Sequence, residues 1–187
     1  MATVNDRQLP SPLVVDASVA LALELDEPQA TSLQRLIAGH RARSGRLLVP
    51  DMFWLEVVNV LNRRHRVRSE LILATLQTLD DLGIESVRIE RPLLLLALDL
   101  QGRFGLTASD AAYLALAETE DARLLTLDRR LADAAGDRAV GIEGVHPHRL
   151  AEEPAPYGAE PINWARFGPY LARLRAEARA EARSAAR

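Results

Sequence analysis

Short apolar runs alternate with longer segments of helical periodicity up to about residue 145. Runs of three or four apolar residues are typical of buried strands, whereas apolar residues spaced three and four apart indicate helices. The predicted strands are residues 13–15, 47–49, 84–89, 124–127 and 139–142. The predicted helices are residues 18–25, 29–42, 52–67, 69–83, 92–102, 110–118 and 128–135. The alternation predicts an α/β fold, an α/β/α sandwich with a mainly parallel sheet covered on both faces.

Short polar residues stand at the starts of several predicted helices. Asp51, Ser109 and Asp128 each lie directly before a helical segment. Side chains of this type often cap the first turn of a helix by accepting a backbone N–H bond. We therefore expect these three residues to mark helix N-termini.

A change in composition divides the chain into four segments. Residues 1–11 are polar and read as an N-terminal arm, and residues 12–145 form the predicted domain. Residues 146–169 are rich in proline and predict a linker, and residues 170–187 are rich in Ala, Arg and Glu and predict a helical tail. The absence of cysteine fits a reducing compartment. We find no membrane span or secretory signal and expect a cytoplasmic protein with no membrane partner.

The basic residues narrow the range of functions. All 23 are arginines, so a P-loop nucleotide-binding site, which needs a phosphate-binding lysine, is disfavoured. The formal net charge is −3, so any contact with a nucleic acid has to come from a local cluster of arginines. One such cluster follows the predicted helix 52–67 and is a candidate RNA-binding surface, with a solvated helix face as the alternative: Arg63, Arg64, Arg66 and Arg68.

Four carboxylates stand at positions where a parallel sheet places its ligands. Asp16 and Asp128 each follow an apolar strand, so both are expected at the carboxyl edge of the sheet. Asp110 lies at a helix start, where the helix dipole favours an anion. Glu56 lies within an otherwise apolar helix segment, where a charged group is costly unless it is paired or bound to metal.

Each carboxylate also has a simpler explanation. The aspartates can serve as helix caps or as favourable first-turn charges. Glu56 can pair with Arg63, because Glu56, Asn59 and Arg63 are spaced as one polar stripe on a helix. If all four carboxylates converge, however, their mutual repulsion requires compensation, and a hard divalent cation with oxygen ligands provides it.

In their order and spacing, the segments VVDAS, LEVVNVL, SDAAYLALA and LLTLD resemble the PIN domain, specifically the VapC-type toxins of prokaryotic toxin–antitoxin pairs. The resemblance covers about residues 12–145 and implies the fold predicted above. By matching position, it implies that Asp16, Glu56, Asp110 and Asp128 are the catalytic acids that hold Mg²⁺ or Mn²⁺. It further implies supporting roles near the metal for three polar residues: Ser18, Asn59 and Thr126.

The resemblance also implies a function. A chain of this family is expected to be a metal-dependent endoribonuclease in which metal-activated water cleaves RNA and leaves 5′-phosphate ends. Its expected partners are an RNA substrate, a cognate antitoxin protein and a second copy of itself in a homodimer. The alternatives are a non-catalytic PIN-like module that binds RNA or protein, and a metal-dependent DNase or phosphatase using the same acidic site.

Overall fold

The computed structural model describes residues 10–141 and 169 of the chain. Four parallel strands form one sheet in the order β3-β2-β1-β4. Leu13 is the register partner of both Leu47 and Arg123, so the central strand is paired on both sides. The strands are β1 (Leu13–Val15), β2 (Leu47–Pro50), β3 (Ile84–Val87) and β4 (Arg123–Leu125).

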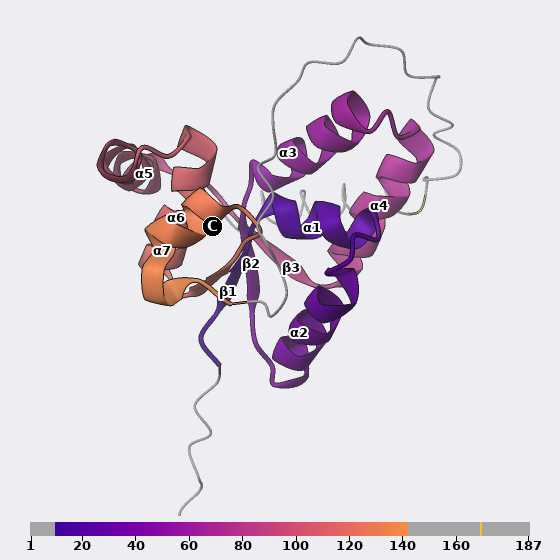
Figure 1. The fold of residues 1–187 in the computed structure, drawn as a ribbon, viewed down its shortest axis with the longest axis horizontal. Helices are drawn as coiled ribbons and strands as arrows, with labels where there is room; N and C mark the ends of the chain where they lie inside the picture. Colours follow the sequence, from indigo (N-terminus) through magenta and orange to yellow (C-terminus); the bar gives the residue numbers. More distant parts are fainter. Residues whose placement is uncertain (1–9, 142–168, 170–187) are drawn as a thin grey trace, which may run out of the picture.

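Helices cover both faces of this sheet (Figure 1). One side carries α1 (Ala17–Glu24), α2 (Ala30–Ala42), α3 (Phe53–Asn59) and α4 (Ser69–Asp81). The other side carries α5 (Arg91–Phe104), α6 (Ala108–Thr119) and α7 (Arg129–Ala135). The predicted α/β/α sandwich with a parallel sheet is therefore confirmed.

Burial explains why the sequence forms these layers. Every residue of β1 and β2 is buried, as expected for strands covered on two faces. Helix α6 is buried on all sides over residues 111–117, because it packs between the sheet and α5. Its alanines bring the helix close to the strands, and Tyr113 is its largest fully buried side chain. Helix α5 ends at Gly105, whose φ of 65° suits glycine.

The strand order creates a switch point between β1 and β4. From β1 the chain runs through β2 to β3 on one side, and it then returns to place β4 on the other side of β1. The loops after β1 and β4 therefore leave the sheet in opposite directions. Open parallel sheets bind ligands at the carboxyl edge beside such a point. Asp16 follows β1 and Asp128 follows β4, so both lie at this edge.

Two predicted helix starts are wrong. Asp51 does not begin a helix: its backbone N–H bonds to the Val87 carbonyl, and α3 starts at Phe53 after a turn. The cap of α6 is Thr107 rather than Ser109, because the Thr107 hydroxyl accepts the backbone N–H of Asp110. In both cases the polar residue lies close to the helix start, but another residue occupies the N-cap position: Met52 for α3 and Thr107 for α6.

Several predicted elements are shorter than expected, and one helix and one strand differ most. The helix expected over residues 52–67 continues from α3 into a π-helical segment, η1 (Val60–Arg64), and stops there. Arg66 has a positive φ of 51°, which a continuing α-helix does not allow. The strand expected over residues 139–142 is a single bridge between Leu124 and Ala139.

Some of the predicted segments lie outside the described residues. These are most of the N-terminal arm, nearly all of the linker and the helical tail. The segment limits 1–11, 12–145, 146–169 and 170–187 accordingly stay predictions. Among residues 10–141 and 169, no helix combines the length and apolar character needed to cross a bilayer.

Candidate active site

Asp16 is the most deeply buried of the four carboxylates, with an exposed fraction of 6%. Its backbone N–H bonds to the Leu125 carbonyl of β4 at 3.0 Å, which locks the residue to the neighbouring strand. Its Oδ2 accepts hydrogen bonds from the hydroxyls of Ser18 and Thr126. Burial raises the pKa of Asp16 from 3.8 to about 6, although the two hydroxyl bonds act in the opposite direction.

The same two hydroxyls connect the loops after β1 and β4. Ser18 Oγ accepts the backbone N–H of Leu127 at 3.0 Å, and Thr126 Oγ1 accepts that of Asp128 at 3.0 Å. Each hydroxyl therefore donates to Asp16 and accepts a backbone N–H from the loop after β4, which uses both of its functions. The structure thus places Ser18 and Thr126 directly against Asp16, while the role expected of them stays a prediction.

Asp128 is the N-cap of α7. Its Oδ1 accepts the backbone N–H of Leu131 at 2.9 Å. One oxygen of Asp128 therefore caps the helix, as the alternative to a metal-binding role predicts. Asp128 also raises the pKa of Asp110, so capping does not remove it from the acidic cluster.

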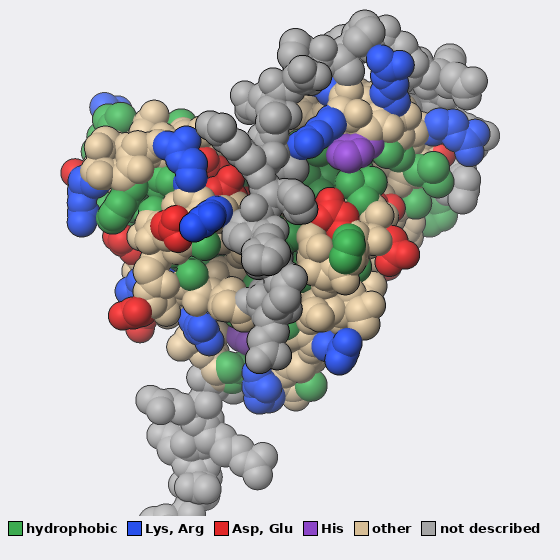
Figure 2. Space-filling model, viewed as in Figure 1, with side chains coloured by type: hydrophobic (Ala, Val, Ile, Leu, Met, Phe, Trp, Pro, Cys, Tyr) green, Lys and Arg blue, Asp and Glu red, His purple; other side chains and the backbone are tan. Residues whose placement is uncertain are grey.

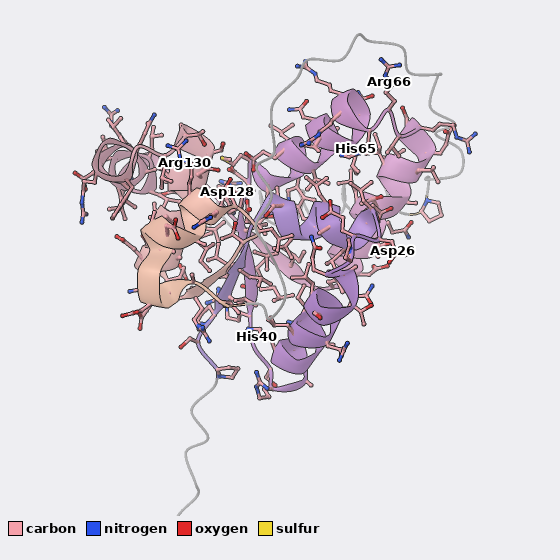
Figure 3. The ribbon with its side chains drawn as sticks, in the orientation of Figure 1. Asp26, His40, His65, Arg66, Asp128 and Arg130 are labelled. Carbon is pink, nitrogen blue, oxygen red and sulfur yellow. The ribbon has the colours of Figure 1, made fainter. Side chains whose placement is uncertain are left out.

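Asp110 lies in the first turn of α6. Its backbone N–H donates to the capping hydroxyl of Thr107 at 3.1 Å. Burial is the main cause of its raised pKa; the Thr107 hydroxyl lowers the pKa, Asp128 raises it further, and the charge of Arg130 lowers it slightly. Arg130 also donates to the Gly105 carbonyl at 2.5 Å, which ties the start of α7 to the loop before α6. Figure 3 shows Asp128 and Arg130 together at the start of α7.

Glu56 faces this group from α3. Its Oε2 accepts a hydrogen bond of 2.5 Å from the hydroxyl of Tyr113 on α6. Burial raises the pKa of Glu56 from 4.5 to about 7; hydrogen bonds from the side chains of Tyr113 and Ser109 oppose this, and the charges of Asp16 and Asp110 add to it. The structure thus assigns to Glu56 two hydrogen-bond partners on α6, the side chains of Tyr113 and Ser109, whereas the sequence offered Arg63. Arg63 and Asn59 are exposed to solvent.

The four carboxylates form one electrostatic group. Asp110 raises the pKa of Asp16 and of Glu56, and Asp128 raises the pKa of Asp110. Carboxylates repel in this way when their negative charge lacks compensation, and a hard divalent cation prefers oxygen ligands of this type. The chemistry of the donor set therefore fits a divalent cation. Within the described residues, however, no group of three or more acidic or histidine side chains is already arranged so that it could hold a metal ion.

The arginine cluster lies at the far end of the helix that carries Glu56. Arg63, Arg64, Arg66 and Arg68 are all exposed, at and beyond the end of η1. Figure 2 shows basic side chains gathered with a histidine over this end of the molecule, and Figure 3 labels His65 and Arg66 there. The cluster is thus exposed to solvent, which both an RNA-binding surface and a solvated helix face require.

Tyr113, Thr107 and Arg130 were not anticipated as site residues. A signal for Tyr113 was present in the sequence, because it follows Asp110 by three residues and so shares a helix face with it. Its contact with Glu56 joins residues 57 positions apart, which periodicity along one helix does not indicate. The pKa of Tyr113 is raised by burial and by Asp16 and Glu56, so its hydroxyl keeps its proton and acts as a donor.

Comparison with known proteins defines the class to which this fold and site belong. The model of the PIN domain family matches residues 13–137. The chain is also 34% identical over 125 residues to Ribonuclease VapC3 of Pyrobaculum aerophilum, across 65% of this chain and 92% of that protein. The chain therefore belongs to the PIN domain family. The resemblance to VapC-type proteins that the four ordered motifs carry is confirmed.

Two solved structures share the fold. A toxin–antitoxin complex from Klebsiella pneumoniae contains a chain with a TM-score of 0.50 and 17% identity, covering 69% of this chain and 96% of that one. A crystal structure of a Pyrobaculum aerophilum protein gives a TM-score of 0.53 and 22% identity, covering 74% of this chain and 91% of that one. At these identities the matches establish a common architecture.

Proposed function

We propose that this chain is a metal-dependent endoribonuclease that acts as the toxin of a toxin–antitoxin system. One observation carries the proposal: four carboxylates from four separate segments interact at the carboxyl edge of the sheet, beside the switch point. Membership of the PIN family and the similarity to a protein named as a ribonuclease support it.

Asp16, Asp110 and Asp128 are the proposed metal ligands, with Glu56 as a fourth carboxylate beside them. Mg²⁺ or Mn²⁺ suits such oxygen donors. A bound divalent cation would supply a water of lowered pKa and would neutralise charge on the scissile phosphate.

The protein contributes orientation and proton control. Ser18 and Thr126 hold one oxygen of Asp16, so the plane of this carboxylate is fixed before any ligand binds. Glu56, with a pKa of about 7, can accept a proton from a water at neutral pH, and we propose that it orients the attacking water. Asn59 is exposed and stays a proposed auxiliary residue one turn further along α3.

Arg63, Arg64, Arg66 and Arg68 are the proposed contacts to the RNA backbone. The chain carries a net negative charge, so substrate attraction requires a local positive surface. Exposed guanidinium groups suit phosphates because they donate in a fixed, forked geometry. Arg63 and Arg64 lie in η1, which continues the helix that carries Glu56, and Arg66 and Arg68 follow in the turn that leads to α4.

The proposed partners follow from the same assignment. A solved relative of this fold is described as a toxin–antitoxin complex, which supports a cognate antitoxin as partner. We also propose a homodimer and a cytoplasmic location, where an RNA-cleaving toxin would meet its substrate. Light scattering on the purified chain measures whether it is a homodimer. Copurification with the product of a neighbouring gene identifies the antitoxin.

Two other functions are outcomes of the same experiment. A non-catalytic module gains nothing from carboxylates that raise one another's pKa, which disfavours it. Purified protein is incubated separately with total RNA, with DNA and with a phosphomonoester, each with Mg²⁺, Mn²⁺ or EDTA. RNA cleavage that EDTA abolishes and that leaves 5′-phosphates supports the proposal. Cleavage confined to DNA or to the monoester, or no cleavage, overturns it.

A further inference from the structure

We propose that Tyr113 is a positioning residue that holds Glu56 in place through one carboxylate oxygen. The inference deepens the proposed function and rests on it, because that function places Glu56 in the catalytic group. The underlying observation is the 2.5 Å hydrogen bond from the Tyr113 hydroxyl to Glu56 Oε2, which joins α6 to α3.

The tyrosine ring is a fixed platform for its hydroxyl. The Tyr113 side chain is fully buried, with an exposed fraction of 0%, and lies on the helix packed between the sheet and α5. A phenol has two side-chain torsions and one O–H donor, so close packing of the ring determines where that donor points. The hydroxyl therefore stays in one position without needing Glu56 to hold it.

Glu56, in contrast, needs a restraint. Its carboxylate ends a flexible side chain, and it is repelled by Asp16 and Asp110. Half-burial on α3 leaves it the alternative of turning outward into water, away from both aspartates. The hydrogen bond from Tyr113, which lowers the pKa of Glu56 more than the bond from Ser109 does, opposes this movement and keeps the carboxylate beside the other acids.

The register of α6 makes this restraint part of the site. Asp110 and Tyr113 are three residues apart, so one helix face presents both a proposed ligand and the donor that holds Glu56. Tyr113 bonds Oε2, and Ser109, in the first turn of the same helix, also hydrogen-bonds the Glu56 side chain. Tyr113 itself contacts no reacting atom in this assignment and acts through Glu56.

A phenylalanine would fill the same volume, so Tyr113→Phe isolates the hydroxyl. Loss of a group that orients a metal-site residue typically costs about 10- to 100-fold in metal affinity or activity. We expect kcat for RNA cleavage to fall by about this factor while KM for RNA changes by less than about 3-fold. Mn²⁺ binding measured by calorimetry weakens in parallel.

A double-mutant cycle separates positioning from a structural role. In the Glu56→Gln background, Tyr113→Phe should change neither kcat nor Mn²⁺ affinity by more than about 2-fold, because the residue through which it acts is already altered. Equal losses in the two backgrounds would overturn the proposal. So would a Tyr113→Phe variant with wild-type kcat and Mn²⁺ affinity.

Two further variants guard the interpretation. Thr75→Val removes another buried hydroxyl, which donates to the Leu71 carbonyl within α4, and should leave kcat and Mn²⁺ affinity unchanged. If Tyr113→Phe does not fold, Glu56→Asp carries the test, since it keeps the charge but withdraws the carboxylate from the hydroxyl by one methylene. Activity of Glu56→Asp equal to wild type would contradict the proposal.

The Mn²⁺ measurement also distinguishes this inference from the proposed function. If the wild-type chain binds Mn²⁺ but cleaves no RNA, the ribonuclease assignment fails. Weaker Mn²⁺ binding by Tyr113→Phe, absent in the Glu56→Gln background, would still establish that Tyr113 positions Glu56. If the wild-type chain cleaves RNA and Tyr113→Phe causes the same loss in the wild-type and Glu56→Gln backgrounds, only the positioning proposal fails.

Discussion

Thr126 and Asp16 are 110 residues apart in the chain, and the Thr126 hydroxyl donates to Asp16 Oδ2 at 2.8 Å. The bond joins the ends of β4 and β1 at the switch point of the sheet. Ser18 donates to the same oxygen, so the carboxylate is fixed from two sides. The buried charge of Asp16 is therefore oriented by the fold itself, and its raised pKa records the cost of placing it there.

Replacing Asp16 by Asn should abolish metal-dependent RNA cleavage while preserving the fold. The amide retains the shape of the carboxylate but removes the negative charge that a divalent cation requires. Because ionised Asp16 is unfavourable in the fold, metal-free stability at neutral pH should be unchanged or higher. Cleavage assays with Mn²⁺ and thermal melts with EDTA measure the two effects.

Asp133→Asn is the matched control for this variant. Asp133 is an exposed carboxylate that pairs with Arg129 on the surface of α7, outside the acidic group. The same chemical change there should leave cleavage unchanged. Full ribonuclease activity in Asp16→Asn would show that the site has been misassigned.

Expression of the chain in a bacterial host should arrest growth, and Glu56→Gln should relieve the arrest. The motivation is the proposed toxin function together with the buried position of Glu56 among the other acids. Growth curves after induction, at equal protein levels, give the result. If the variant arrests growth as strongly as the wild type, the toxicity does not depend on Glu56 or on the proposed cleavage reaction.

As the pH rises, the metal-free wild-type protein should lose stability relative to a variant such as Asp16→Asn, in which an amide replaces a buried carboxylate. Folding raises the pKa of Asp16 from 3.8 to about 6 and that of Glu56 from 4.5 to about 7, so the folded state binds protons more tightly than the unfolded state. As the pH rises from about 4, the unfolded chain loses these protons first and stability falls. The loss is complete above about pH 6 for Asp16 and above about pH 7 for Glu56.

Denaturant melts of the chelator-treated protein between pH 4 and pH 8 check this expectation. The free energy of unfolding of Asp16→Asn minus that of the wild type should increase over the window by an amount on the order of 2–3 kcal/mol. Taking the difference cancels the carboxylates that Asp16 does not influence, and the loss of its repulsion on Glu56 acts in the same direction as its own titration. A difference independent of pH would mean that Asp16 titrates normally in the fold.

Alanine substitution of Arg63, Arg64, Arg66 and Arg68 should weaken RNA binding and reduce its salt dependence. Each lost phosphate contact lowers the log–log slope by roughly 0.7 for single-stranded nucleic acid. Arg35 on α2 and Arg43 at the C-cap of that helix are exposed arginines, and their replacement serves as the control for a general change in charge. An unchanged slope for the cluster variant would make the cluster a solvated helix face.

Much of this fold follows from local patterns in the sequence. The apolar runs 13–15 and 47–49 predict the two central strands within a residue, because buried parallel strands need apolar side chains on both faces. The helices around them follow from their periodicity. The predicted limits of two helices are wrong. Thr107 rather than Ser109 caps α6, and the helix that carries Glu56 ends in the π-helical segment η1.

The candidate site could be predicted only in part. The sequence by itself determined which residue types stand at the strand ends and helix starts, and the order of four acidic motifs was sufficient to indicate the PIN family. The tertiary structure decided which groups satisfy these carboxylates: Tyr113 and Ser109 for Glu56, and Thr126 together with Ser18 for Asp16. Strand and helix patterns depend on interactions between near neighbours, whereas these bonds depend on how β1, β4, α3 and α6 pack. Contacts that span 57 and 110 residues are therefore decided by the packing of the whole domain.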